Sequence, residues 1–240
     1  MAVAKRELGR TGLQVTTLGY GAMELRGAPR ARDITEEQAE TILNKVLDSG
    51  INYIDTSIDY GLSEERIGRY ISHRRAEYYL ASKCGCLVGA PPAPRGQRGA
   101  HVFTRDNVVA GVEQSLTRMK TDYLDVVQFH ASPSRQTLEE HGALDALLEL
   151  REAGKVRFIG MSGTLPHLID HIAVGVLTSF RSLTRRSSES TKLRSPLLLR
   201  RVQASSFVAA QQRERQPRGS KPGCSGSVGA GHISMTCSAT

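Results

Sequence analysis

Between residues 36 and 172 the chain alternates between segments with helical periodicity and short apolar segments typical of buried strands. The expected helices cover 36–47, 63–71, 104–119, 144–152 and 164–172, and the expected strands cover 52–54, 78–81, 124–129 and 156–161. Strands that alternate with helices in this way favour right-handed crossover connections and a parallel sheet. The sequence therefore predicts an α/β protein.

The turns after the first strands distinguish between two parallel architectures. No Gly-x-Gly-x-x-Gly pattern comes after these strands, which disfavours a Rossmann domain. The other common parallel architecture is the (β/α)8 TIM barrel, whose active sites lie at the C-terminal ends of the strands. Residues 6–15 are expected to form a hairpin, and about five β/α units come after it, up to residue 174. We therefore expect an incomplete (β/α)8 TIM barrel.

Four polar residues lie at or just beyond the ends of successive expected strands. Asp55 and Tyr60 follow strand 52–54, Lys83 follows strand 78–81, and His130 follows strand 124–129. Alone, each has an ordinary structural interpretation, because such residues usually serve as helix caps, loop residues or core polar groups. In this order, with the flanking sequences YGLSE and SK, they resemble the catalytic tetrad of the aldo-keto reductase superfamily. The resemblance extends over about residues 6–174.

The resemblance implies carbonyl reduction with a nicotinamide cofactor. Tyrosine is a weak acid at neutral pH, and a buried ammonium beside it makes proton donation easier. By resemblance, Tyr60 is the general acid and Lys83 supplies the ammonium. Asp55 would keep Lys83 charged and fixed, and His130 would orient the carbonyl oxygen of the substrate. The family also places its N-terminal hairpin across the floor of the barrel.

The resemblance also implies residues that bind the cofactor, NADPH in preference to NADH. Gly21 and Met23 lie in the segment that resembles the turn after the first barrel strand. Ser162 resembles the serine that holds the carboxamide, and Gly163 stands where Asn is commoner. Asp55 is also expected to contribute to cofactor binding. The family's Gln from the next strand, and its loop that grips the 2′-phosphate, have no counterpart in this sequence.

The net charge of +8 lies in the last quarter of the chain. Residues 175–240 hold 11 Lys and Arg against two acidic residues, whereas residues 1–174 hold 21 against 22. Residues 1–174 therefore carry no excess of positive charge that would favour the binding of polyanions. One alternative function is a non-catalytic fragment whose basic tail binds nucleic acid or anionic surfaces. Another is a reductase relative that acts as a binding subunit.

Cysteine spacing argues against a structural zinc site, and hydropathy argues against a membrane-spanning helix. Cys84 and Cys86 form a lone C-x-C, and Cys224 and Cys237 lie in a Gly/Ser-rich stretch. A structural zinc site needs about four ligands with paired spacing, so we expect free thiols and no metal. No apolar run approaches the roughly 20 residues that cross a bilayer, and the N-terminus lacks a signal-peptide core. The expected location is cytoplasmic, and the expected partner is a small-molecule carbonyl substrate.

After residue 174 the alternation stops, and residues 175–240 are rich in Arg, Ser and Gly. This composition is typical of disorder or of a coding sequence read out of register. Restoring one base near codon 177 permits Phe-Asp-Val-Phe-Gln-Ile-Pro-Tyr for 177–184, which resembles the family's sixth strand with its Gln. Five strands cannot close a barrel. We therefore expect a single-nucleotide deletion near this codon, and little or no activity from the 240-residue chain.

Overall fold

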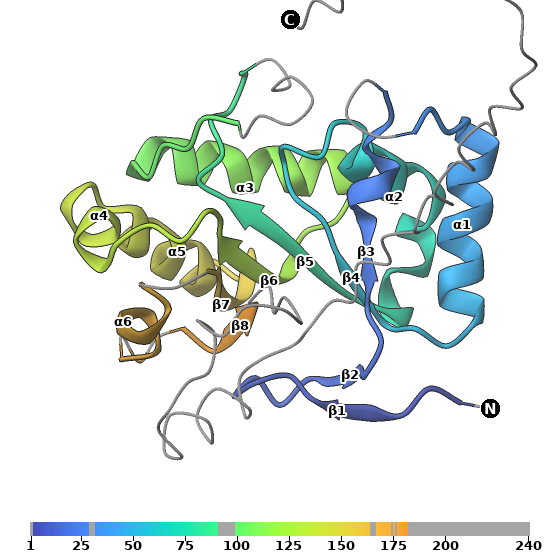
Figure 1. Cartoon of the computed structure of the whole chain (residues 1–240), viewed down its shortest axis with the longest axis horizontal. Helices are drawn as coiled ribbons and strands as arrows, with labels where there is room; N and C mark the ends of the chain where they lie inside the picture. Colours follow the sequence, from blue (N-terminus) through green and yellow to red (C-terminus); the bar gives the residue numbers. More distant parts are fainter. Residues whose placement is uncertain are drawn as a thin grey trace, which may run out of the picture.

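A curved parallel sheet forms the centre of the computed structural model, which describes residues 2–28, 32–90, 99–163, 167–173, 175 and 177–181. In this part of the chain the sheet has six strands in sequential order (Figure 1). They are β3 (Tyr20–Gly21), β4 (Tyr53–Asp55), β5 (Tyr79–Cys84), β6 (Leu124–Phe129), β7 (Val156–Ser162) and β8 (Ser179–Arg181). A closed TIM barrel has eight strands in the same sequential order. The described strands therefore form an incomplete barrel, as the sequence predicted.

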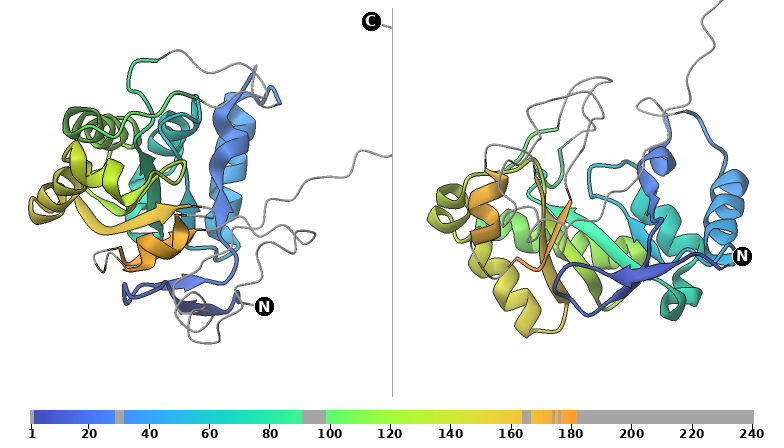
Figure 2. Two further views of the ribbon diagram at one scale, coloured as in Figure 1. Left: turned by 60° about the vertical axis from the view of Figure 1, so that its left-hand side comes forward. Right: turned by 60° about the horizontal axis from the view of Figure 1, so that its bottom comes forward.

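Helices connect these strands and cover one face of the sheet (Figure 2). They are α1 (Glu36–Asp48), α2 (Ser63–Tyr70), α3 (Arg105–Met119), α4 (Arg135–Glu140), α5 (Ala143–Glu152) and α6 (Leu168–Ala173), with 3-10 helices η1 (Ala22–Arg26) and η2 (Ser72–Glu77). α1 begins at a capping box, in which Thr35 and Gln38 bond each other's backbone N–H groups. None of the described helices is long and apolar enough to cross a membrane.

The main hydrophobic core lies between the sheet and these helices. Leu43 of α1, Val112 of α3 and Leu147 of α5 are buried in one cluster with Ile54 and Leu80 of the sheet. Helical spacing puts the apolar residues of each helix on one stripe, and that stripe faces the strands. The burial of these faces fixes where each strand ends, and therefore where the polar residues after the strands lie.

The N-terminal hairpin covers the end of the sheet at which the strands begin. β1 (Lys5–Glu7) pairs in antiparallel fashion with β2 (Gln14–Thr16). Leu8 and Val15 from this hairpin are buried with Tyr53 and Val126, which come from β4 and β6. This second apolar cluster closes the end of the sheet opposite the C-terminal ends of the strands. The hairpin predicted from residues 6–15 is therefore present and serves as the floor.

The sheet continues past residue 174, where the periodic pattern of the sequence stops. β8 pairs in parallel with β7, with Phe180 opposite Met161, and Leu177 is fully buried. Arg10 of the floor hairpin donates to the carbonyl oxygen atoms of Gly175 and Leu177 at 2.7 and 2.9 Å. Sheet pairing thus extends into a segment whose side chains show no regular apolar period. The remainder of the predicted disordered tail, residues 182–240, lies outside the described residues.

Gly68 sets the distance between α2 and α3. A Cβ atom at this position would lie 2.0 Å from the backbone oxygen of Arg118 and 2.8 Å from Cα of Met119. We expect Gly68→Ala to lower the free energy of unfolding of the full chain by about 1–3 kcal/mol, because backbone atoms must move apart. Chemical denaturation measures this change.

Gly111 in α3 offers a matched helix position. A Cβ atom there would lie 3.4 Å from Cδ1 of Ile58, which is an ordinary contact with a flexible side chain. Gly111→Ala should leave stability unchanged or raise it by up to about 1 kcal/mol through helix propensity. Equal effects of the two substitutions would contradict the tight packing assigned to Gly68.

Candidate active site

Parallel pairing brings the four predicted residues to the same end of the sheet. Asp55 is the last residue of β4, Lys83 lies near the end of β5, and His130 directly follows β6. Asp55 is paired with Ala81 in the ladder, and Lys83 with Gln128. Tyr60 lies in the loop between β4 and α2. The C-terminal end of the sheet therefore holds all four side chains.

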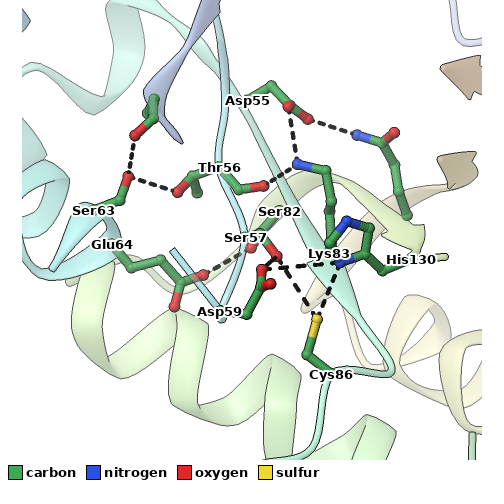
Figure 3. Close-up of polar contacts among 12 residues, drawn as sticks. Asp55, Thr56, Ser57, Asp59, Ser63, Glu64, Ser82, Lys83, Cys86 and His130 are labelled. Carbon is green, nitrogen blue, oxygen red and sulfur yellow. Dashed lines mark hydrogen bonds and ion pairs between the residues drawn. The ribbon is translucent and has the colours of Figure 1, made fainter. Parts of the chain in front are cut away.

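Lys83 and Asp55 form a buried ion pair (Figure 3). Nζ of Lys83 lies 2.9 Å from Oδ2 of Asp55 and 2.5 Å from the carbonyl oxygen of Thr56. The side chains are 0 % and 3 % exposed. Nε2 of Gln128 donates to the other Asp55 oxygen at 2.9 Å. Charges this deeply buried are tolerated only when they are paired and hydrogen-bonded, so this arrangement holds the ammonium in one place.

The Tyr60 ring lies over this ammonium. Nζ of Lys83 is 4.8 Å from the ring centroid, within the range of a cation–π contact. Tyr60 is 7 % exposed, and its ring meets the His130 ring edge-on at a centroid distance of 6.4 Å. Within the described residues, no hydrogen bond to the Tyr60 hydroxyl is present. The contacts described for this side chain are therefore made by its ring.

The loop that carries Tyr60 is held on both sides. The Tyr60 amide donates to the carbonyl of Ser57, and the Ser63 amide donates to the carbonyl of Tyr60. Gly61 has φ +48°, and a Cβ there would lie 2.6 Å from the backbone oxygen of Arg26. Only glycine fits such a position without strain. The Tyr-Gly sequence thus fixes the tyrosine against the lysine.

Glu64, in the first turn of α2, links the Tyr60 loop to β5 and α3. Its Oε1 accepts hydrogen bonds at 2.7 Å from Ser82 in β5 and from Ser115 in α3. Burial raises the pKa of the Glu64 carboxyl, and the two serine bonds oppose this change. Because Ser82 precedes Lys83, Glu64 ties the start of α2 to the strand that carries the lysine. The YGLSE and SK flanks are therefore joined in the structure.

His130 lies in a crowded polar cluster. Its Nδ1 is 3.1 Å from Sγ of Cys86, 3.4 Å from Nε2 of His101 and 3.9 Å from Oδ1 of Asp59. Burial lowers the pKa of His130 to about 3, and the nearby charge of Lys83 adds to this effect. Burial raises the pKa of the Cys86 thiol to about 12. At pH 7 the imidazole is therefore neutral, and one of its nitrogen atoms can donate a hydrogen bond.

This lowered pKa predicts a pH-dependent contribution to stability. Imidazole in the unfolded chain titrates near pH 6.5, whereas His130 in the folded chain titrates near 3. The folded state binds fewer protons between these values, so stability is lost as the pH falls from about 6.5 towards 3. One such group contributes up to about 1.4 kcal/mol per pH unit. We expect His130→Asn to lose less stability than the wild type between pH 7 and 5 in denaturant titrations, and identical pH slopes would contradict this.

The residues expected to hold a nicotinamide lie around the same end of the sheet. Gly21 is the last residue of β3 and pairs with Asp55. Met23 follows in η1, and Ser162 ends β7, with Gly163 directly after it. A Cβ built on Gly21 would meet no atom within 4 Å, so open space adjoins the backbone there. Ser162 is half-buried.

Sequence reasoning missed three members of the site. Gln128 is buried and bonds Asp55; its signal was an amide near the end of a mainly apolar strand. Cys86 and His101 lie beside His130, although the sequence predicted only a free thiol at Cys86. No spacing rule connects these last two residues with His130, because three separate segments supply them.

Comparison with known proteins agrees with this geometry. The sequence profile described as Aldo/keto reductase family matches residues 17–214. The chain belongs to this family. The aldo-keto reductase AKR11C1 from Bacillus halodurans, in its holo form, superimposes with a TM-score of 0.72 at 27 % identity. The match covers 91 % of this chain and 72 % of that one. The partial barrel is therefore part of an aldo-keto reductase TIM barrel.

Curated relatives share about a third of their residues with the aligned part of this aldo-keto reductase chain. The uncharacterized oxidoreductase YqkF of Bacillus subtilis is 31 % identical over 196 residues, which cover 77 % of this chain and 58 % of YqkF. L-Galactose dehydrogenase of Arabidopsis thaliana is 32 % identical over 190 residues, which cover 72 % and 53 %. The chain thus spans little more than half the length of these relatives.

Proposed function

We propose that this chain carries the active site of a cytoplasmic carbonyl reductase that converts an aldehyde or ketone to an alcohol with NADPH. The observation that carries the proposal is the buried Lys83 ammonium, held by Asp55 and lying against the Tyr60 ring. A buried cation next to a phenol is suited to proton transfer. Family membership supports oxidoreductase chemistry at this site.

Each residue has a distinct role in this proposal. Tyr60 donates a proton to the carbonyl oxygen, and the positive charge of Lys83 stabilises the phenolate that remains. Asp55 keeps Lys83 charged and in place. His130, neutral at pH 7, donates a hydrogen bond that orients the carbonyl oxygen. The bound nicotinamide supplies the hydride that the carbonyl carbon receives.

The cofactor contacts are proposed from the strand ends. Ser162 would hydrogen-bond the carboxamide, with Gly163 beside it, and the open backbone at Gly21 would lie against the ring together with Met23. Asp55 completes this surface. A preference for NADPH over NADH is tested by titrating the protein with each and following the fluorescence of the reduced nicotinamide. Equal affinities would contradict the preference but not the reduction itself.

We further propose that the reading frame changes near codon 177. Support comes from the change of composition after residue 174 and from the family-like strand that one restored base permits. The test is to sequence genomic DNA across codons 170–190. One additional base would restore the family-like reading frame, and its product is called the frame-restored chain below. An unchanged read would contradict the proposal and leave the 240-residue chain as the product.

The activity test compares these two chains. Both are supplied with NADPH and a panel of aldehydes, ketones, sugars and quinones, and NADPH oxidation is followed by absorbance. We expect turnover by the frame-restored chain and little or none by the 240-residue chain, because the sequence of the latter has no counterpart of the family's Gln or of the loop that grips the 2′-phosphate. Full activity of the 240-residue chain would contradict the second part of this expectation.

A further inference from the structure

Cys86, His101 and His130 bring three metal-binding atoms together at the C-terminal end of the sheet. The Cys86 thiol, one imidazole nitrogen of His101 and one of His130 lie within 4.8 Å of one another. Sγ of Cys86 is 3.1 Å from Nδ1 of His130, and Nε2 of His101 is 3.4 Å from the same nitrogen. Figure 3 shows Cys86 and Asp59 both directed towards His130. Such a cluster of one sulfur and two nitrogen donors is a typical ligand set for zinc.

The backbone holds two of these residues in fixed positions. Cys86 and His101 are partners in an isolated antiparallel bridge, and the Leu87 amide donates to the carbonyl of Ala100. The Asn107 side chain donates to the carbonyl oxygen atoms of Cys86 and Val102, at 3.1 and 2.8 Å. The bridge thus presents both ligand side chains to His130 before any ion binds. Preorganisation of this kind lowers the entropic cost of binding.

The spacing of the donor atoms fits tetrahedral coordination. With Zn–N bonds of about 2.0 Å and a Zn–S bond of about 2.3 Å, tetrahedral angles separate two nitrogen ligands by about 3.3 Å and a sulfur from a nitrogen by about 3.5 Å. The His101–His130 separation agrees with the first value. The Cys86–His130 separation requires the sulfur to move by about half an ångström, which a rotation of one side chain provides.

We propose that Cys86, His101 and His130 bind a zinc-type divalent cation through one thiolate and two imidazoles, leaving a fourth coordination position open. The Cys86 thiol gives up its proton when the ion binds. Asp59, whose Oδ1 lies 3.9 Å from Nδ1 of His130, adds negative charge beside the ion. The nearest buried cation, Lys83, is already paired with Asp55. Asp59 therefore offsets part of the positive charge that Lys83 and a bound dication bring to the cluster.

The consequence for catalysis rests on the proposed function. His130 also belongs to the site proposed for carbonyl reduction, and its ring lies edge-on against Tyr60. An ion at Nδ1 fixes the ring that, in the proposed mechanism, orients the carbonyl oxygen. We therefore expect zinc to inhibit the reductase. The binding itself does not require that the chain reduce carbonyls, so it is measured without substrate or cofactor.

The test is a Co²⁺ titration of the metal-free full chain, followed by absorption spectroscopy. Tetrahedral cobalt with a cysteine ligand gives visible ligand-field bands and a near-ultraviolet thiolate-to-metal band, and added Zn²⁺ should abolish both. We expect one equivalent of cobalt at this site. Cys86→Ala should remove the thiolate band, and His101→Ala should weaken the ligand-field bands. Circular dichroism of each variant verifies that the fold is retained.

Cys84→Ala is the matched control. Cys84 is buried in the same region, two residues away, but does not belong to the cluster. Its substitution should leave the cobalt spectrum unchanged. A spectrum of equal intensity in Cys86→Ala would place the metal elsewhere, for instance at the thiols of Cys224 and Cys237, and would overturn the proposal. So would the absence of any cobalt band from the folded wild type. Inhibition without these bands would count against the proposal as well.

Discussion

Tyr60→Phe is expected to lower kcat/KM for carbonyl reduction by the frame-restored chain about 10²–10⁴-fold, the usual contribution of a general acid. The substitution removes only the hydroxyl. No described residue bonds that hydroxyl, and the ring would still pack against Lys83 and His130. The affinity for NADPH and the free energy of unfolding should therefore stay unchanged. Steady-state kinetics, cofactor titration and denaturant titration measure these three quantities separately.

Tyr70→Phe serves as the control for this substitution. Tyr70 donates a hydrogen bond from its hydroxyl to Glu36, on the outer side of α2. Loss of this bond should leave carbonyl reduction unaffected. If Tyr60→Phe retained wild-type kcat/KM, another group would have to donate the proton, and the assignment of Tyr60 would be wrong.

Lys83→Met is expected to have the largest effect on stability. The substitution leaves the Asp55 carboxylate buried without its partner ion, and breaking one side of a buried pair costs about 3–5 kcal/mol. Activity should fall as well, because the positive charge beside Tyr60 is lost. Denaturant titration measures the first effect and steady-state kinetics the second.

A second substitution separates these two effects. Asp55→Asn in the Lys83→Met background removes the unpaired charge and keeps an acceptor for the Gln128 amide, which bonds Asp55 at 2.9 Å. We expect the double variant to recover part of the lost stability without recovering activity. Recovery of both would show that the lysine contributes only to folding. No recovery of stability would contradict the description of the pair as a compensated buried charge.

Regular elements with a clear side-chain period could be predicted from the sequence. α1, α3 and α5 and strands β4–β7 lie where the apolar patterns placed them, within a few residues. β5 was expected to end at residue 81 but continues to Cys84. The sequence placed Ser82 and Lys83 directly after the strand, not within it. They are buried because Glu64 and Asp55 bond them, and these partners are distant in sequence.

Other elements lack such a pattern. α4 has one buried apolar residue, Leu138, and begins at the Ser134 cap instead of at an apolar repeat. β8 forms through backbone pairing with β7, which leaves little mark on the side chains. The tetrad was predictable because family-like flanks surround each member. The cluster of Cys86, His101 and His130 was not, since an irregular bridge between two segments brings it together.

Transfer of deuterium tests the central claim most directly. The frame-restored chain is incubated with an aldehyde and with NADPH that carries deuterium at the reactive C4 position, and the alcohol is examined by mass spectrometry. We predict an alcohol that is one mass unit heavier, formed by the wild type and at strongly reduced rate by Tyr60→Phe. A folded frame-restored chain that binds NADPH but yields no labelled alcohol from any carbonyl tested would contradict the account.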